Sequence, residues 1–113
     1  MAHIQQGDVY ALFGDAVGKR RLVVIVTCNA LLGGDAVQVI PFTSKQLEKR
    51  RQLAYCAFFP AGAFGQDLDC VAKADMLTLM DKMEIDFAVG KIGTLTSAQL
   101  ARVFEALDAV HGR

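Results

Sequence analysis

The chain of 113 residues has twelve basic and twelve acidic side chains, so its formal net charge is zero, and 53% of its residues are hydrophobic. This size predicts one domain, residues 1–113, with a core of its own. The hydrophobic content excludes a disordered chain, and the charge balance argues against a protein held on nucleic acid by bulk charge alone.

The N-terminal segment lacks the basic-then-apolar pattern of a signal sequence, and no apolar run approaches membrane-spanning length. We therefore expect a cytoplasmic protein with no membrane partner. The cysteines Cys28, Cys56 and Cys70 are odd in number and form no CxxC pair. They are predicted to be buried free thiols, and no metal site or other cofactor is expected.

Continuous or alternating apolar runs predict short strands over residues 7–13, 22–27, 36–42, 53–59, 69–79 and 87–92. Ser44 is placed to cap a helical turn over residues 45–49. Near the C-terminus, Thr96 and Gln99 form a capping box, with Leu95 and Leu100 placed as a hydrophobic staple.

The segment after this capping box has apolar residues at helical spacing, namely Leu100, Val103, Phe104 and Leu107. One face of the helix is therefore expected to pack on a sheet. Several short strands followed by one amphipathic helix predict a mostly β fold of the α+β type, a small barrel with a helix across it.

Arg21 and Thr43 each stand at the edge of a run apolar enough to be a core strand. If the chain reverses near Gly33 and Gly34, Thr43 lies opposite Val24, with Arg21 three residues further along, roughly 10 Å away. A guanidinium beside a hydroxyl on one rim of a sheet is a phosphate-binding arrangement. On these two residues alone, a solvated strand-edge charge and an ordinary strand threonine are the favoured interpretation.

Taken in chain order, several short segments resemble the MazF/PemK toxins of type II toxin–antitoxin pairs. The segments are Gly7-Asp8-Val9, Arg21-Leu22 with the strand that ends at Thr27, Pro41-Phe42-Thr43-Ser44, a looser Asp69–Met76, and Gly90-Lys91-Ile92-Gly93-Thr94-Leu95-Thr96. Each segment is weak alone, but the ordered set favours a functional role for Arg21 and Thr43. The resemblance implies an SH3-like, CcdB/PemK-type β-barrel with a C-terminal helix.

The resemblance also implies a metal-independent endoribonuclease, an mRNA interferase. In this reaction the 2′-hydroxyl of single-stranded mRNA attacks the adjacent phosphate. Arg21 would stabilise the negative charge and Thr43 would bind a phosphate oxygen, while Asp75 would be the general base. Lys73 stands where some members have an arginine, and strand alternation would put Lys73 and Asp75 on one face. The plainer interpretation of these two residues is a surface ion pair.

Binding of RNA needs cations along the backbone and flat side chains for stacking. Lys19, Arg20 and Lys45 are the predicted cations, and Arg20 competes with Arg21 for the catalytic role. Phe64, in a loop between small residues, is the predicted stacking platform. By resemblance, the partners are a second copy of the chain and an antitoxin with an acidic, disordered tail.

Three residues depart from the family pattern: Leu22 replaces a proline, Met76 a glutamine and Thr78 an arginine. These departures keep open a barrel that has lost catalysis and acts as a binding module. A second alternative is a CcdB-like gyrase poison, because Val39–Ser44 fits that family equally well. The helix of this chain lacks the Trp-Gly-Ile ending of the gyrase poisons, which weighs against that alternative.

Overall fold

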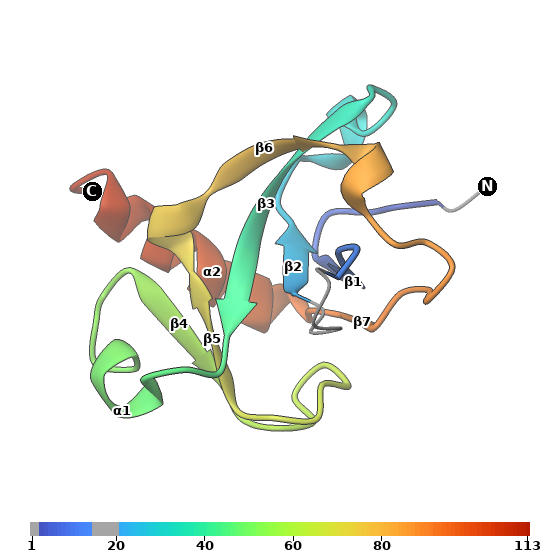
Figure 1. The fold of residues 1–113 in the computed structure, drawn as a ribbon. Coiled ribbons are helices and arrows are strands. Elements are labelled where there is room, and N and C mark those ends of the chain that lie inside the picture. The colour runs from blue at the N-terminus through green and yellow to red at the C-terminus, as the bar shows by residue number, and fades with distance from the viewer. Residues whose placement is uncertain (1–2, 15–20) are drawn as a thin grey trace.

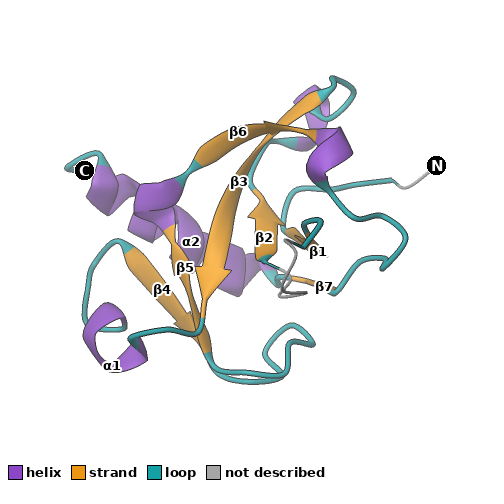
Figure 2. Cartoon of the chain, viewed as in Figure 1, coloured by secondary structure: helices purple, strands orange, loops and turns teal. Residues whose placement is uncertain are grey.

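The computed structural model describes residues 3–14 and 21–113, and Figures 1 and 2 show how its elements are arranged. Its strands are β1 (Asp8–Ala11), β2 (Leu22–Ile25), β3 (Ala36–Thr43), β4 (Cys56–Phe59), β5 (Cys70–Lys73), β6 (Thr78–Asp81) and β7 (Gly93–Thr94). Its helices are α1 (Leu47–Arg50) and α2 (Ser97–Val110), and 3₁₀ turns form η1 (Asn29–Leu31), η2 (Ala74–Met76) and η3 (Lys82–Glu84).

The strands form one antiparallel sheet in the order β4-β5-β3-β2-β1-β7, with β6 also paired to β3. Strand β3 is the longest, and its two halves have different neighbours along one edge: β6 pairs with Ala36–Val39, and β5 pairs with Phe42 and Thr43. The sheet curls into a half-barrel, and α2 lies across one face (Figure 1). The mostly β fold with a C-terminal helix is thereby confirmed.

The main core lies between the sheet and α2. Val103 and Ala106 of α2 are buried in the same cluster as Ile40, Phe42 and Phe59 of the sheet. This arrangement confirms the apolar helix face expected from the spacing of its residues. A second cluster, which includes Tyr10, Val23, Ile25 and Val39, fills the other side of the curled sheet.

The two helices begin in different ways. Thr96 accepts the backbone N–H of Gln99, and the Gln99 side chain accepts the N–H of Thr96, so the predicted capping box of α2 is confirmed. The predicted Ser44 cap of α1 is wrong. Gln46 precedes α1 in a left-handed conformation, with φ 55° and ψ 40°, and no side chain caps the helix.

Several predicted strand boundaries are also wrong. The predicted strand over 69–79 is two strands separated by η2, and the strand over 53–59 begins only at Cys56. Phe42 pairs with Ala72 of β5, and Val39 pairs with Thr78 of β6. The segment from Ala72 to Thr78 is three residues longer than the segment of β3 from Val39 to Phe42, and η2 accommodates the extra residues. Residues 87–92 form no strand, because the last strand is Gly93–Thr94.

Asp8 is a buried carboxylate, 1% exposed, that joins the start of the chain to β7. Its Oδ2 accepts the backbone N–H of Gln5 at 2.9 Å, and its Oδ1 accepts the Thr94 hydroxyl at 2.9 Å. The Lys91 ammonium lies 3.8 Å from Oδ1. Asp8 therefore connects three separate segments of the chain.

Replacing Asp8 with alanine is expected to lower the free energy of unfolding by about 2–4 kcal/mol, because a fully buried side chain loses its two hydrogen bonds and its ion pair and leaves a cavity. Urea denaturation followed by circular dichroism measures this change. Asp35→Ala, at an exposed carboxylate, is the matched control and should change stability by less than about 0.5 kcal/mol. Equal midpoints for the two variants would contradict the structural role of Asp8.

Within residues 3–14 and 21–113, neither helix combines the length and the apolar character needed to cross a bilayer.

Candidate functional site

The candidate site lies on the face of the sheet that points away from α2. Phe42 and Ala72 pack in the core cluster with α2, so the next residues along their strands, Thr43 and Lys73, project from the opposite face. Cys56 pairs directly with Lys73 across β4 and β5 and shares its face. Alternation along three strands thus brings a hydroxyl, an ammonium and a thiol to one surface.

Helix α1 extends over this surface and contributes Arg50. The Arg50 Nη1 donates to Thr43 Oγ1 at 3.3 Å and to the Lys45 carbonyl at 3.1 Å. The Lys45 backbone N–H also donates to Thr43 Oγ1, at 3.2 Å. These contacts fix the guanidinium beside the Thr43 hydroxyl.

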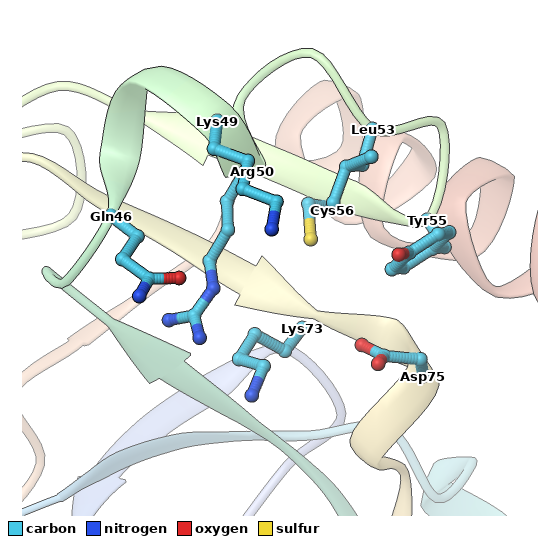
Figure 3. Close-up of a pocket in the computed structure, with 8 residues that line it drawn as sticks. All are labelled: Gln46, Lys49, Arg50, Leu53, Tyr55, Cys56, Lys73 and Asp75. Carbon is cyan, nitrogen blue, oxygen red and sulfur yellow. The ribbon is translucent and has the colours of Figure 1, made fainter.

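A hollow of about 190 Å³ lies between α1 and the strands β4 and β5. We call it the cationic pocket, and its lining residues are Gln46, Lys49, Arg50, Leu53, Tyr55, Cys56, Lys73 and Asp75. Figure 3 shows Arg50 and Lys73 directing their charged ends toward the same part of the pocket, and Asp75 and Tyr55 at the other end. The pocket therefore has a cationic end, and its opposite end has a carboxylate and an aromatic ring.

The two cations of the pocket have no acidic partner in the described part of the chain. The ion pairs of the described residues join Arg51 to Glu48 and Lys91 to Asp8. Lys73 and Asp75 are therefore not joined in the surface ion pair that was the plainer interpretation of these residues. Two half-buried cations that form no ion pair with a described carboxylate can bind an external anion.

Cys56 forms part of the floor between these charges, and its environment keeps the thiol protonated. Burial raises the pKa of the Cys56 thiol and the negative charge of Asp75 raises it further, whereas Arg50 and Lys73 act in the opposite direction. A neutral, 8% exposed thiol is a poor nucleophile. Covalent chemistry at Cys56 is therefore not supported by the geometry.

The other two cysteines differ from each other. Burial raises the pKa of the Cys70 thiol to about 11, with a smaller rise from Asp69 and an opposing effect of the hydrogen bond from Gln66. Cys28 is exposed, so the prediction that all three thiols are buried is wrong for that residue. It lies just before η1, in the connection between β2 and β3.

The predicted placement of Arg21 relative to Thr43 is corrected by the strand register. Ile40, and not Thr43, lies opposite Val24. The reversal is not a tight hairpin at Gly33 and Gly34, because η1 occupies part of the connection. The pairing of β2 with β3 ends at Val23–Pro41, so Arg21, which directly precedes β2, and Thr43, which ends β3, lie beyond the same end of this pairing.

Arg21 itself is exposed, and its backbone carbonyl accepts the N–H of Leu12 at 2.8 Å. It is not among the residues that line the cationic pocket. The structure thus places Arg21 just before β2, at the same end of the sheet as Thr43, while Arg50 makes the direct contact with the Thr43 hydroxyl.

Lys73 and Asp75 reach one pocket by a different route from the predicted one. Lys73 ends β5, but Asp75 lies in η2, so alternation along a single strand is the wrong reason for their proximity. The turn at Ala74 carries Asp75 around the end of the strand. Both residues nevertheless line the cationic pocket, as Figure 3 shows.

The predicted RNA-binding residues have mixed outcomes. Lys19 and Arg20 lie outside the described residues. Lys45 is exposed and directly follows the Thr43–Ser44 segment. Phe64 is not an exposed stacking platform, because it is 6% exposed. Its ring centroid lies 4.9 Å from that of Phe42, and its loop is held by a hydrogen bond from the Phe64 N–H to Gln66 Oε1 at 3.0 Å.

Sequence reasoning missed Arg50, Tyr55 and Gln46 as site residues. Arg50 is the middle one of three consecutive basic residues, Lys49, Arg50 and Arg51. Helical periodicity would have distinguished Arg50 from its two neighbours. Arg50 stands three residues after Leu47 and three before Leu53, so it shares the inward-packing face with these leucines. Gln46 and Tyr55 carry no such signal.

A curled antiparallel half-barrel with a helix on one face and a cationic pocket on the other defines a small α+β domain of the SH3-like barrel class. A family model described as the PemK-like, MazF-like toxin of type II toxin–antitoxin system matches residues 5–111, so the chain belongs to this family. No curated protein sequence matches the chain significantly.

Solved structures with the same fold are distant in sequence. The chain is similar to an endoribonuclease in complex with its cognate antitoxin from Mycobacterial species, with a TM-score of 0.72, 19% identity and coverage of 99% of this chain and 96% of that chain. It is also similar to the Mycobacterium tuberculosis toxin MazF-mt6, with a TM-score of 0.75, 21% identity and coverage of 93% and 96%. For the MazE–MazF structure from Deinococcus radiodurans the TM-score is 0.74, with 20% identity and coverage of 99% and 98%.

Proposed function

We propose that this chain is a toxin with metal-independent endoribonuclease activity on single-stranded mRNA. The observation that carries the proposal is the cationic pocket, in which Arg50 and Lys73 have no acidic partner among the described residues and Arg50 is bonded to Thr43. A phosphodiester supplies the anion that this arrangement lacks. Membership of the toxin family supports the same conclusion.

The residues of the pocket suit the charge that develops during RNA cleavage. When the 2′-hydroxyl attacks phosphorus, negative charge grows on the non-bridging oxygens. The planar guanidinium of Arg50 donates to one or two of them, and the Lys73 ammonium stabilises the same charge. Thr43 donates its hydroxyl to a phosphate oxygen, since its own oxygen already accepts from Arg50 and the Lys45 backbone.

The reaction also moves two protons. Asp75 accepts the proton of the 2′-hydroxyl as its oxygen bonds to phosphorus. The bond from phosphorus to the 5′-oxygen breaks, and the leaving oxygen takes a proton from the Arg21 guanidinium. The products are a 2′,3′-cyclic phosphate and a free 5′-hydroxyl. Tyr55 offers an aromatic face beside Asp75 on which a base can stack.

The test is cleavage of single-stranded RNA by the purified chain, with and without a chelator. Mass spectrometry should find a cyclic phosphate on one fragment and a 5′-hydroxyl on the other. Primer extension on total RNA after induction should find breaks at a short recognition sequence. Growth arrest with intact transcripts would refute the ribonuclease and favour the gyrase-poison alternative.

Thr43→Val is expected to lower the rate of cleavage about 10-fold or more, because the shape is nearly kept and the hydroxyl is lost. The melting temperature should change little. Thr27→Val is the matched control, since the Thr27 hydroxyl also accepts a backbone N–H, from Gln38 at 2.7 Å, at the other end of the sheet. Cleavage by Thr43→Val at the wild-type rate would remove Thr43 from the site.

The proposed partners are a second copy of the chain and an antitoxin with an acidic, disordered segment. The pocket cations Arg50 and Lys73, which pair with no acidic side chain in the described part of the chain, suit such a segment, and exposed Lys45 and Lys49 lie nearby. An acidic peptide bound there would exclude RNA. Competition between a poly-glutamate peptide and labelled RNA, at varied salt, tests this arrangement, and simultaneous binding of both would contradict it.

A further inference from the structure

Gln46 has an unfavourable backbone conformation at the edge of the cationic pocket. Among the described residues that are not glycine, it is the one with a positive φ, 55°. A side chain on Cβ is disfavoured in this left-handed region, whereas glycine adopts it freely. The backbone alone would therefore favour glycine at this position.

The side chain of Gln46 is directed to a place where it can bind a ligand. Gln46 is exposed and lines the cationic pocket together with Arg50, and Figure 3 shows its amide on the side of the pocket toward which the Arg50 guanidinium points. The amide has no hydrogen-bond partner among the described residues. The contacts within the described chain thus give no structural reason for a long amide side chain at a strained position, and strain of this kind is concentrated at functional sites.

We propose that Gln46 determines sequence specificity by pairing with the edge of an unpaired nucleobase next to the phosphate held by Arg50 and Lys73. This inference rests on the proposed function, because it takes single-stranded RNA as the ligand. The amide offers an acceptor beside a donor, and this pair matches the amino group and ring N7 of adenine. Single-stranded RNA exposes such edges, which are covered in a duplex.

The decisive variant is Gln46→Gly, because it separates folding from recognition. Relief of the left-handed strain should raise the melting temperature by a few degrees or leave it unchanged. The same variant should lose about 5- to 100-fold of base discrimination at one position of the RNA. A residue with only a structural role would not lose recognition while the fold became more stable.

Two readouts are needed. The first is sequencing of a random RNA pool after cleavage. The second is the affinity for the same pool made from 2′-O-methyl nucleotides, which cannot be cut. Gln46→Asn, which keeps a shorter amide and tolerates the left-handed region, should retain part of the preference. Gln52→Ala is the control, since the Gln52 amide bonds to the Glu48 carbonyl within the α1 segment.

The outcomes are distinguishable. Loss of preference at one position by Gln46→Gly, in either readout, supports the inference. An unchanged base preference of Gln46→Gly overturns the inference. If the base preference is unchanged but overall RNA binding falls, Gln46 contacts the phosphate and not a base. The wild type could bind the methylated pool with a base preference that Gln46→Gly lacks, and still cut no RNA. In that case the ribonuclease proposal fails and the recognition role of Gln46 stands. If the wild type shows no preference in either readout, the recognition role fails.

Discussion

Arg50→Ala is expected to reduce the rate of RNA cleavage about 100-fold or more while the domain remains folded. The Arg50 side chain is half-buried in the pocket, and its contacts are to the Thr43 hydroxyl and the Lys45 carbonyl rather than to the core. Removal of one preorganised donor that stabilises a developing oxyanion costs about 2.7–4 kcal/mol of activation free energy in comparable sites. Single-turnover kinetics on an oligonucleotide with the preferred cleavage sequence measures the loss.

The neighbouring residue provides a matched control. Arg51 has the same charge, but it lies over the Phe58 ring, 4.1 Å from the centroid, and pairs with Glu48 at 3.9 Å. Arg51→Ala should therefore change the rate less than about 3-fold, consistent with the small value of an exposed pair. Arg50→Lys should recover only part of the activity, because an ammonium does not donate two parallel bonds. Equal rates for the alanine variants would show that only the charge of the basic run matters.

The parts of the fold that the sequence predicted are those set by local patterns. The capping box at Thr96 and the helical spacing of Val103 each depend on residues within a few positions, and both are confirmed. The wrong strand boundaries depend on long-range geometry. The segment 69–79 is interrupted at η2 because β5 and β6 both pair with β3. No local pattern within the segment reveals this shared pairing.

The candidate site shows the same division. Thr43, Lys73 and Asp75 were recognised by their resemblance to family segments, and the structure brings Lys73 and Asp75 into one pocket next to Thr43. Arg50 was missed because its position depends on how α1 folds back over the sheet. Phe64 was misjudged because small neighbours suggested an open loop, whereas that loop packs its ring against Phe42.

The close approach that buries Phe64 depends on glycine. A Cβ placed on Gly93 of β7 would lie 1.6 Å from the Phe64 carbonyl oxygen, and one on Gly65 would lie 2.9 Å from the Ile92 carbonyl oxygen. Two backbone segments therefore meet without side chains between them. Phe64 is held by this contact against Phe42, the residue before Thr43, so the contact also supports the strand end that carries the site.

Gly93→Ala is accordingly expected to lower the free energy of unfolding by about 3 kcal/mol or more, because the clash is with backbone, which cannot move aside as a flexible side chain can. For a domain of this size, such a loss corresponds to a fall in melting temperature of about 10 °C or more. Gly33→Ala is the control, since its Cβ would meet nothing within 4 Å, and it should melt at or slightly above the wild-type temperature. Calorimetry on both variants measures the difference. Similar melting temperatures would mean that the two segments separate easily, and the Phe64 loop would then contribute little to the shape of the site.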